Sequence, residues 1–133
     1  MKITVKSCLV LALVFTACQE SMEQRAVREA REYTERMCPT PVYNDTRTDS
    51  VTFDIDSRTY TYHCSFHNSL DDSQAINNIK DQLNKQLKLA LTDATNIKSY
   101  KEAGFNFQYI CRSAKHPETI LYQATFKADE INR

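Results

Sequence analysis

Two pairs of alternating segments constrain the fold of this chain more than any other feature of its sequence. In the first pair, residues 51–55 and 60–66 alternate apolar with polar side chains around a short polar turn. In the second pair, residues 105–111 and 120–126 do the same around a longer loop. A period of two is typical of a strand with one buried face, so each pair predicts a β-hairpin.

A segment with helical spacing precedes each hairpin. Between Ser21 and Met37, apolar residues recur every three or four positions, and charged residues fill the other positions. Asp71 and Asp72 are typical helix-start residues, and they precede a second helix that we expect to run to about Leu91. The apolar stripe of this helix comprises Ile76, Ile79, Leu83, Leu87, Ala90 and Leu91.

The expected architecture is a single α+β domain with the order α-β-β-α-β-β. We expect a four-stranded antiparallel sheet with the helices packed on one face, where the aromatic side chains lie. The segments Tyr60 to Cys64 and Phe105 to Cys111 look like counterparts, which suggests an internal duplication. Two such units predict one compact domain rather than a repeat array.

The composition excludes several classes of protein. The formal net charge is zero, which argues against a nucleic-acid-binding protein, since such proteins carry a basic footprint. A single glycine, Gly104, leaves no room for a phosphate-binding loop or a dinucleotide fingerprint. Gly104 instead follows a short helical segment over residues 97–103, where a left-handed residue often ends a helix.

The N-terminal residues predict an export signal. Lys2 and Lys6 precede a run of seven apolar residues, Leu9 to Phe15, and small residues then lead to Cys18. The run is too short for a membrane-spanning helix, which needs about 20 apolar residues. We therefore expect residues 1–17 to be removed as a signal peptide, leaving residues 18–133 as one globular domain.

Phe15, Thr16, Ala17 and Cys18 together resemble a bacterial lipobox, with Phe15 at the position where the family prefers leucine. The resemblance implies cleavage before Cys18, which then carries diacylglycerol and acyl chains such as palmitate. Two or more chains on one residue hold a protein stably at a bilayer. Gln19 differs from the aspartate that retains such proteins at the inner membrane, so the resemblance implies the outer membrane. A cysteine beside an ordinary cleavage site, or in an uncleaved membrane helix, is the alternative reading.

The whole pattern, an export signal followed by an α-β-β-α-β-β domain, resembles small exported bacterial lipoproteins whose activity is unassigned. More distantly, it resembles the helix-and-sheet pilotins that escort outer-membrane secretins. These resemblances imply a non-enzymatic, lipid-anchored envelope protein that binds a protein partner as an assembly accessory. The expected partners are the membrane, through the lipid anchor, and another envelope protein.

Three further cysteines follow Cys18 in the exported part of the chain: Cys38, Cys64 and Cys111. Cys64 and Cys111 lie on the predicted core side of their strands, so they can form a disulfide if those strands are adjacent and in register. An oxidising periplasm favours such a bond. A bridge that involves Cys38, and three free thiols, are the alternatives that the sequence leaves open.

The sequence shows no catalytic or metal-binding constellation. His63 and Cys64 are neighbours on a predicted strand and point to opposite faces, so they cannot act as a base and a nucleophile. His63 and His67 share a face, but an extended strand separates them by about 13 Å, too far for one zinc ion. We therefore expect no catalytic residue, no metal and no cofactor.

Three functions remain as hypotheses. We expect first that a protein partner binds the polar open face of the sheet, or an edge strand by β-augmentation. The alternative is a small-ligand-binding domain with a pocket between helices and sheet, and the third hypothesis is a hydrolase or thiol enzyme. The tyrosines expected to line such a pocket are Tyr60, Tyr62, Tyr109 and Tyr122.

Overall fold

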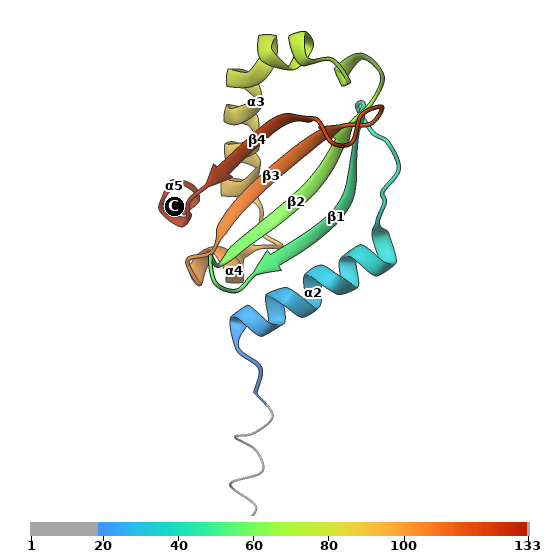
Figure 1. Cartoon of the computed structure of the whole chain (residues 1–133). Coiled ribbons are helices and arrows are strands. Elements are labelled where there is room, and N and C mark those ends of the chain that lie inside the picture. The colour runs from blue at the N-terminus through green and yellow to red at the C-terminus, as the bar shows by residue number, and fades with distance from the viewer. Residues whose placement is uncertain (1–18, 133) are drawn as a thin grey trace, which may run out of the picture.

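The computed structural model describes residues 19–132, so the predicted signal peptide and Cys18 lie outside the described residues. Four strands and two long helices follow one another in the predicted order (Figure 1), with three short helical turns between or after them. The elements are α2 (Met22–Met37), β1 (Thr46–Asp54), β2 (Thr59–Phe66), the 3-10 turn η1 (Asn68–Leu70), α3 (Ser73–Asp93), α4 (Lys98–Glu102), β3 (Asn106–Ser113), β4 (Ile120–Phe126) and α5 (Ala128–Ile131).

Side-chain caps fix the starts of both long helices. The Ser21 hydroxyl accepts a hydrogen bond from the Gln24 amide at 3.1 Å, and the Gln24 side chain accepts one from the Ser21 amide at 2.9 Å. Asp72 caps α3 by accepting from two backbone amides of the first turn. Asp71 does not cap the helix as predicted, because its carboxylate accepts from the Ser113 hydroxyl at the end of β3.

The four strands form one sheet in the order β1-β2-β3-β4. The two predicted hairpins are confirmed as antiparallel pairs, but β2 and β3 run parallel. The sheet is therefore mixed, and the expectation of an all-antiparallel sheet is corrected at its central pair. The physical reason is the connection between β2 and β3, which carries α3 and α4 across the helical face as parallel pairing requires.

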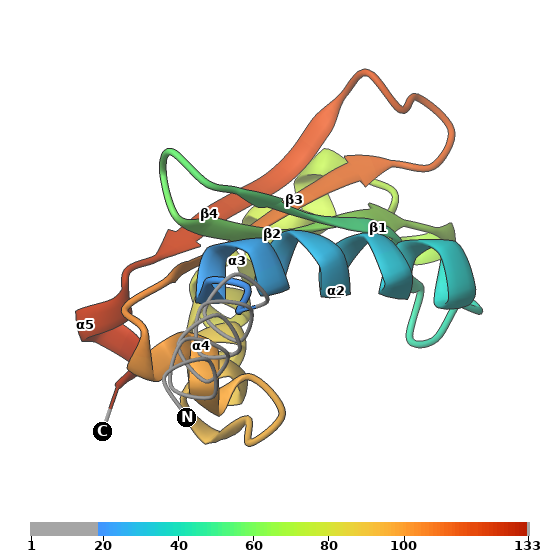
Figure 2. The same ribbon diagram turned by 90° about the horizontal axis from the view of Figure 1, so that it is seen from below.

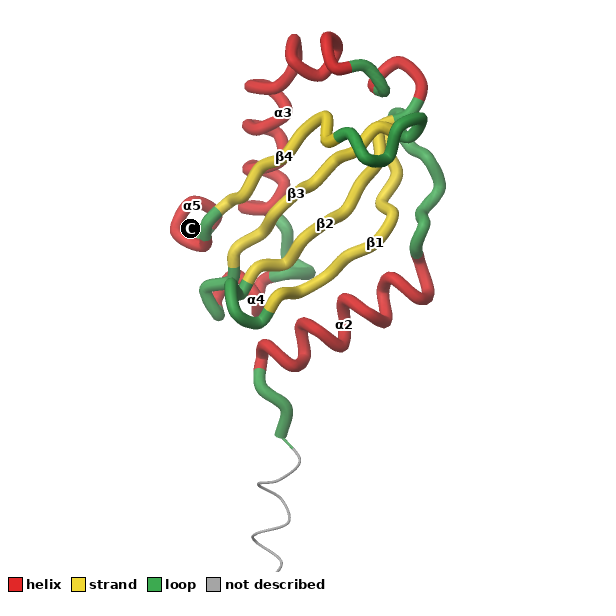
Figure 3. Tube along the Cα trace, in the orientation of Figure 1, coloured by secondary structure: helices red, strands yellow, loops and turns green. Residues whose placement is uncertain are grey.

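The helices cover one face of the sheet, as predicted, and leave the other uncovered (Figures 2 and 3). The strand register aligns four aromatic residues in one row on the covered face: Phe53, Tyr60, Phe107 and Phe126. Helix α2 packs on this core through Ala26 and Ala30, which are 0% and 1% exposed. Their small side chains let the helix approach the sheet closely.

The two segments that look like counterparts in the sequence lie side by side in the structure. Tyr60 is opposite Phe107, and Cys64 is opposite Cys111, in the parallel pair β2–β3. The two similar segments are therefore the second strand of the first hairpin and the first strand of the second hairpin. In a tandem duplication, the similar strands would occupy the same position in each hairpin. Both strands are central in the sheet, and this shared environment explains their similar residues.

A buried lysine holds the C-terminal end of α3. Lys101 is 7% exposed, and its ammonium donates to the carbonyl oxygens of Leu91 and Thr92, both at 2.8 Å. The last carbonyls of a helix have no intrahelical partner, so these bonds replace those that water would make.

We expect Lys101→Met to lower the free energy of unfolding by about 1–3 kcal/mol, because it leaves these two acceptors without a donor. Urea denaturation of both proteins measures the difference. Lys98→Met is the matched control on the same short helix, since the Lys98 side chain is 74% exposed. Equal stabilities for the two variants would contradict the capping role.

Candidate partner-binding groove

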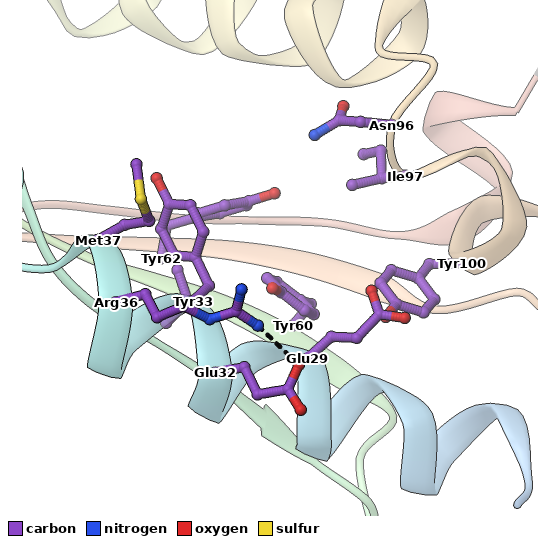
Figure 4. A pocket seen from close by; sticks show the side chains of 11 residues that line it. Glu29, Glu32, Tyr33, Arg36, Met37, Tyr60, Tyr62, Asn96, Ile97 and Tyr100 are labelled. Carbon is purple, nitrogen blue, oxygen red and sulfur yellow. Dashed lines mark hydrogen bonds and ion pairs between the residues drawn. The ribbon is translucent and has the colours of Figure 1, made fainter.

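A groove of about 420 Å³ opens on the helical side of the sheet, between α2 and the loop that enters α4. We call it the tyrosine groove. Figure 4 shows Glu29 extending toward Tyr100 at one end, with Met37 and Tyr62 at the other. Its lining residues are Glu29, Glu32, Tyr33, Arg36, Met37, Val51, Tyr60, Tyr62, Asn96, Ile97 and Tyr100.

Helix α2 supplies one wall of the groove. Glu29, Tyr33 and Met37 are spaced by four residues, so they lie on one face of the helix. Tyr33 is 41% exposed and Met37 is 57% exposed, which is unusual for two large side chains that line the same hollow. This wall therefore presents uncovered apolar surface along about one turn of the helix, next to the Glu29 carboxylate.

The floor of the groove consists of neutral phenols. The ring centroids of Tyr60 and Tyr62 lie 5.4 Å apart, and those of Tyr60 and Tyr100 lie 5.8 Å apart. Burial raises the pKa of Tyr60 to about 12, and burial also raises the pKa of Tyr62. These hydroxyls stay protonated at neutral pH, so they can donate hydrogen bonds but cannot act as bases.

The Tyr100 hydroxyl is buried without a well-formed hydrogen bond to any of residues 19–132. Tyr100 is 5% exposed and lines the groove. Burial, and then the neighbouring Glu29 carboxylate, raise the pKa of Tyr100, so the acid lies close to the phenol without satisfying it in good geometry. An unsatisfied buried hydroxyl costs free energy. This end of the groove therefore offers a polar group that a ligand can use.

The acidic side chains on the α2 wall form ion pairs with arginines of the same helix. Glu29 forms an ion pair with Arg25, and Glu32 lies 3.4 Å from Arg28 and 3.3 Å from Arg36. All of these side chains are substantially exposed, and exposed pairs contribute at most about 1 kcal/mol each. A charged partner can therefore replace them at little cost.

The predicted four-tyrosine pocket is only half present. Tyr60 and Tyr62 line the groove, but Tyr109 stacks on Tyr62 with centroids 4.8 Å apart and contributes to the core. Tyr122 points toward α3, where its hydroxyl donates to the Asn84 side chain. Tyr33 and Tyr100 take their places, and the sequence analysis missed both. The spacing of Tyr33 from Glu29 and Met37 is the signal that pointed to a shared face.

The predicted cysteine pair lies in register. Cys64 and Cys111 face each other directly across β2 and β3, and they are 6% and 4% exposed. Both are free thiols in this structure, as is Cys38 at the end of α2. A hydrogen bond from the Cys111 thiol lowers the pKa of Cys64, and the same contact raises that of Cys111. The disulfide itself stays a prediction.

Serine, histidine and aspartate side chains meet on the open face, but not as a catalytic triad. The Ser65 hydroxyl lies 2.8 Å from His67 Nε2 and 3.3 Å from Asp49 Oδ1, so the serine lies between the other two side chains. In a catalytic triad the histidine lies between the serine and the aspartate. Ser65 is also only 4% exposed, so a substrate cannot reach its hydroxyl. Among residues 19–132, no three histidine, cysteine or acidic side chains are grouped to hold a metal ion.

His63 makes the stability of the open face depend on pH. Its Nε2 lies 3.0 Å from the Thr52 hydroxyl, and burial, followed by the nearby charge of Arg112, lowers its pKa from the ordinary value of 6.5. A lowered folded-state pKa means that the unfolded chain binds more protons in this range. The stability that this group contributes is therefore complete above its unfolded pKa and is lost as pH falls through the lowered folded pKa.

We expect the unfolding free energy of the wild type to fall more steeply below about pH 6.5 than that of His63→Gln, which cannot titrate. Urea denaturation at several pH values on both sides of that point measures the two slopes. Parallel slopes would contradict the stated role of His63.

A comparison with protein families decides where the chain belongs. A family model described as a domain of unknown function, DUF8479, matches residues 21–122. The chain belongs to the DUF8479 family. The matched residues of this DUF8479 domain run from the start of α2 into β4, so they include the whole tyrosine groove. No curated protein matches the chain.

Solved structures share the fold of the DUF8479 domain. A protein from Pseudomonas aeruginosa assigned as secreted is 14% identical, with a TM-score of 0.65, and the match covers 85% of this chain and 99% of that one. The pilotin of the Vibrio vulnificus type 2 secretion system is 9% identical, with a TM-score of 0.63 and coverages of 84% and 92%. The type II secretion system pilotin of Vibrio cholerae is 14% identical, with a TM-score of 0.58 and coverages of 81% and 90%. At these identities the likeness shows the fold alone.

No helix within residues 19–132 of the DUF8479 domain combines the length and the apolar character needed to cross a membrane.

Proposed function

We propose that this protein is a non-enzymatic accessory of the bacterial envelope, which binds a segment of another envelope protein in the tyrosine groove. The observation that carries this proposal is the uncovered apolar wall, where Tyr33 and Met37 stand exposed above a floor of tyrosines. Aromatic residues and methionine are enriched at the centres of protein interfaces. The two pilotins with the same fold support an escort or assembly role of this kind.

One edge of the sheet is closed to the β-augmentation that the sequence suggested. The Thr34 hydroxyl of α2 accepts from the Val51 amide at 2.9 Å and donates to the Val51 carbonyl at 3.0 Å. The segment after α2 covers Thr48 in a similar way. The Thr40 hydroxyl accepts from the Thr48 amide at 3.0 Å, and the Thr40 amide donates to the Thr48 carbonyl at 3.0 Å. An added strand needs those backbone groups, so β1 cannot receive one there.

Variants of the exposed wall test the proposal. We expect Met37→Glu to reduce crosslinking recovery of the partner from native membranes by about tenfold or more, because it places a charge in the apolar contact. Ile55→Glu is the matched control, since Ile55 is 50% exposed and lies outside the groove, in the β1–β2 turn. Equal recovery with the two variants would overturn the groove as the binding site.

Binding of a small ligand is the second candidate, because a volume of about 420 Å³ falls in the range of ligand pockets. Native mass spectrometry of protein purified from its own host distinguishes the two functions. A bound small molecule that Met37→Glu displaces would favour the ligand-binding function. A bound protein that Met37→Glu displaces would instead support the proposed binding of an envelope protein.

The lipid anchor is part of the same proposal. We expect Cys18→Ser to leave an unlipidated precursor without stable acylated anchoring, because the thiol that carries the acyl chains is gone. Intact mass and membrane fractionation measure both effects. Cys38→Ser is the control and is expected to keep its lipid. Lipid that persists on the Cys18→Ser variant would contradict the assignment.

A further inference from the structure

We infer that the partner segment places a lysine or arginine side chain at the Glu29 and Tyr100 end of the tyrosine groove, and apolar side chains against Tyr33 and Met37. This inference rests on the proposed function and names the chemistry of the partner.

The first step concerns hydrogen bonds. The buried Tyr100 hydroxyl has no well-formed partner among residues 19–132, and the Glu29 carboxylate lies beside it (Figure 4). A carboxylate only accepts hydrogen bonds, and the phenol oxygen can accept one as well. A cationic side chain carries several N–H donors, so it satisfies both oxygens together, and bonds to an ionised group are the strong ones.

The second step concerns charge. Glu29 and Glu32 both line the groove, so an acidic occupant meets two carboxylates before it reaches Tyr100. The tyrosine ring faces are not open to a cation, because Tyr60 and Tyr100 are 8% and 5% exposed and the Tyr100 ring is stacked between Tyr60 and Phe105. The Glu29 carboxylate, whose side chain is 37% exposed, is therefore the group that attracts the cation.

Arg25 is the group that the partner has to displace. Its Nε donates to only one carboxylate oxygen of Glu29, Oε1. The side chains of Arg25 and Glu29 are 46% and 37% exposed, so the pair is solvated and weak. A cation that enters from the groove and is shielded by the tyrosines competes favourably with it.

The third step concerns spacing. Glu29 and Met37 are eight residues apart on α2, a rise of about 12 Å along the helix axis. The groove therefore carries the Glu29 carboxylate at one end, and the Met37 side chain, with Arg36 beside it, at the other. A helical segment that lies along α2 matches it with a basic residue seven or eight positions from an apolar residue, which is two turns on the same face.

Charge variants in the full-length, membrane-anchored protein test the inference. We expect Glu29→Lys to lower the recovery of the crosslinked partner by about tenfold or more, since like charges then face each other at a desolvated contact. We expect Glu29→Gln to lower it less, and Arg25→Gln to leave it equal or higher. Glu118→Lys makes the same charge change in the β3–β4 loop, outside the groove, and is the matched control.

The partner side completes the test. Mass spectrometry of the crosslinked peptide identifies the bound segment, and exchange of its basic residue for glutamate is expected to restore binding to Glu29→Lys. Full recovery with Glu29→Lys while Met37→Glu loses the partner would overturn the basic anchor and leave the proposed function intact. Full recovery with both variants would overturn both proposals.

Discussion

The Phe107→Ala variant is expected to lose about 3–5 kcal/mol of unfolding free energy. Phe107 is 0% exposed and lies on the central strand β3, between Tyr60 of β2 and Phe126 of β4. Removal of its ring leaves a cavity that the two neighbouring strands cannot close, because their backbones are fixed by hydrogen bonds. The loss therefore includes both the transfer free energy of the ring and the cost of the cavity.

Guanidinium denaturation of the two proteins measures this loss from the midpoints, provided that the slopes agree. Ile120→Ala is the matched control in the same sheet, because Ile120 is 45% exposed on β4. We expect this control to change the unfolding free energy by less than about 1 kcal/mol. Equal losses for the two variants would contradict the placement of the core on the helical face.

Oxidation is expected to join Cys64 to Cys111 and to raise the unfolding free energy by about 3–4 kcal/mol. The two residues are direct neighbours across β2 and β3, and adjacent strands lie about 4.8 Å apart. This spacing falls within the range of Cα separations in disulfides. The bond closes the long loop that contains α3 and α4, so it restricts the unfolded chain strongly.

Oxidised glutathione is the oxidant: its sulfur–sulfur bond breaks, it accepts two electrons and the two thiol hydrogens to become two molecules of reduced glutathione, and one sulfur–sulfur bond forms in the protein. A thiolate is the nucleophile in each step of this exchange. The intact mass should then fall by two hydrogens, and peptide mapping should place the bond. Cys38→Ser is expected to keep this bond and Cys111→Ser to lose it. A bridge that involves Cys38 instead would contradict the prediction.

Periodicity predicted the elements of this fold well, because one buried face forces alternation in each strand. The same parity placed Cys64 and Cys111 on a common face, and the register confirms that they are adjacent. Alternation carries no information about strand direction, so the parallel pairing of β2 and β3 was missed. Ile55 also followed the alternation, but it lies in the turn and is 50% exposed, because the Asp54 carboxylate accepts from the Ser57 amide and closes the turn early.

The groove was harder to predict, because the buried and the exposed apolar residues of α2 belong to one helical stripe. Ala26 and Ala30 lie in the part of this stripe that packs on the sheet, whereas Tyr33 and Met37 lie toward its C-terminal end and remain exposed. Spacing alone cannot tell where along a stripe the buried part ends. Tyr100, which also lines the groove, is distant in the sequence and reaches it only through the path of α3 and α4.

Site-specific photo-crosslinking in the full-length protein in its native membrane tests the central claim most directly. A photoreactive amino acid at position Met37 samples the tyrosine groove, and one at position Gln108 samples the open face of the sheet. The groove account predicts one discrete protein adduct from Met37 and none from Gln108. An adduct from Gln108 without one from Met37, or no adduct from either position, would contradict it.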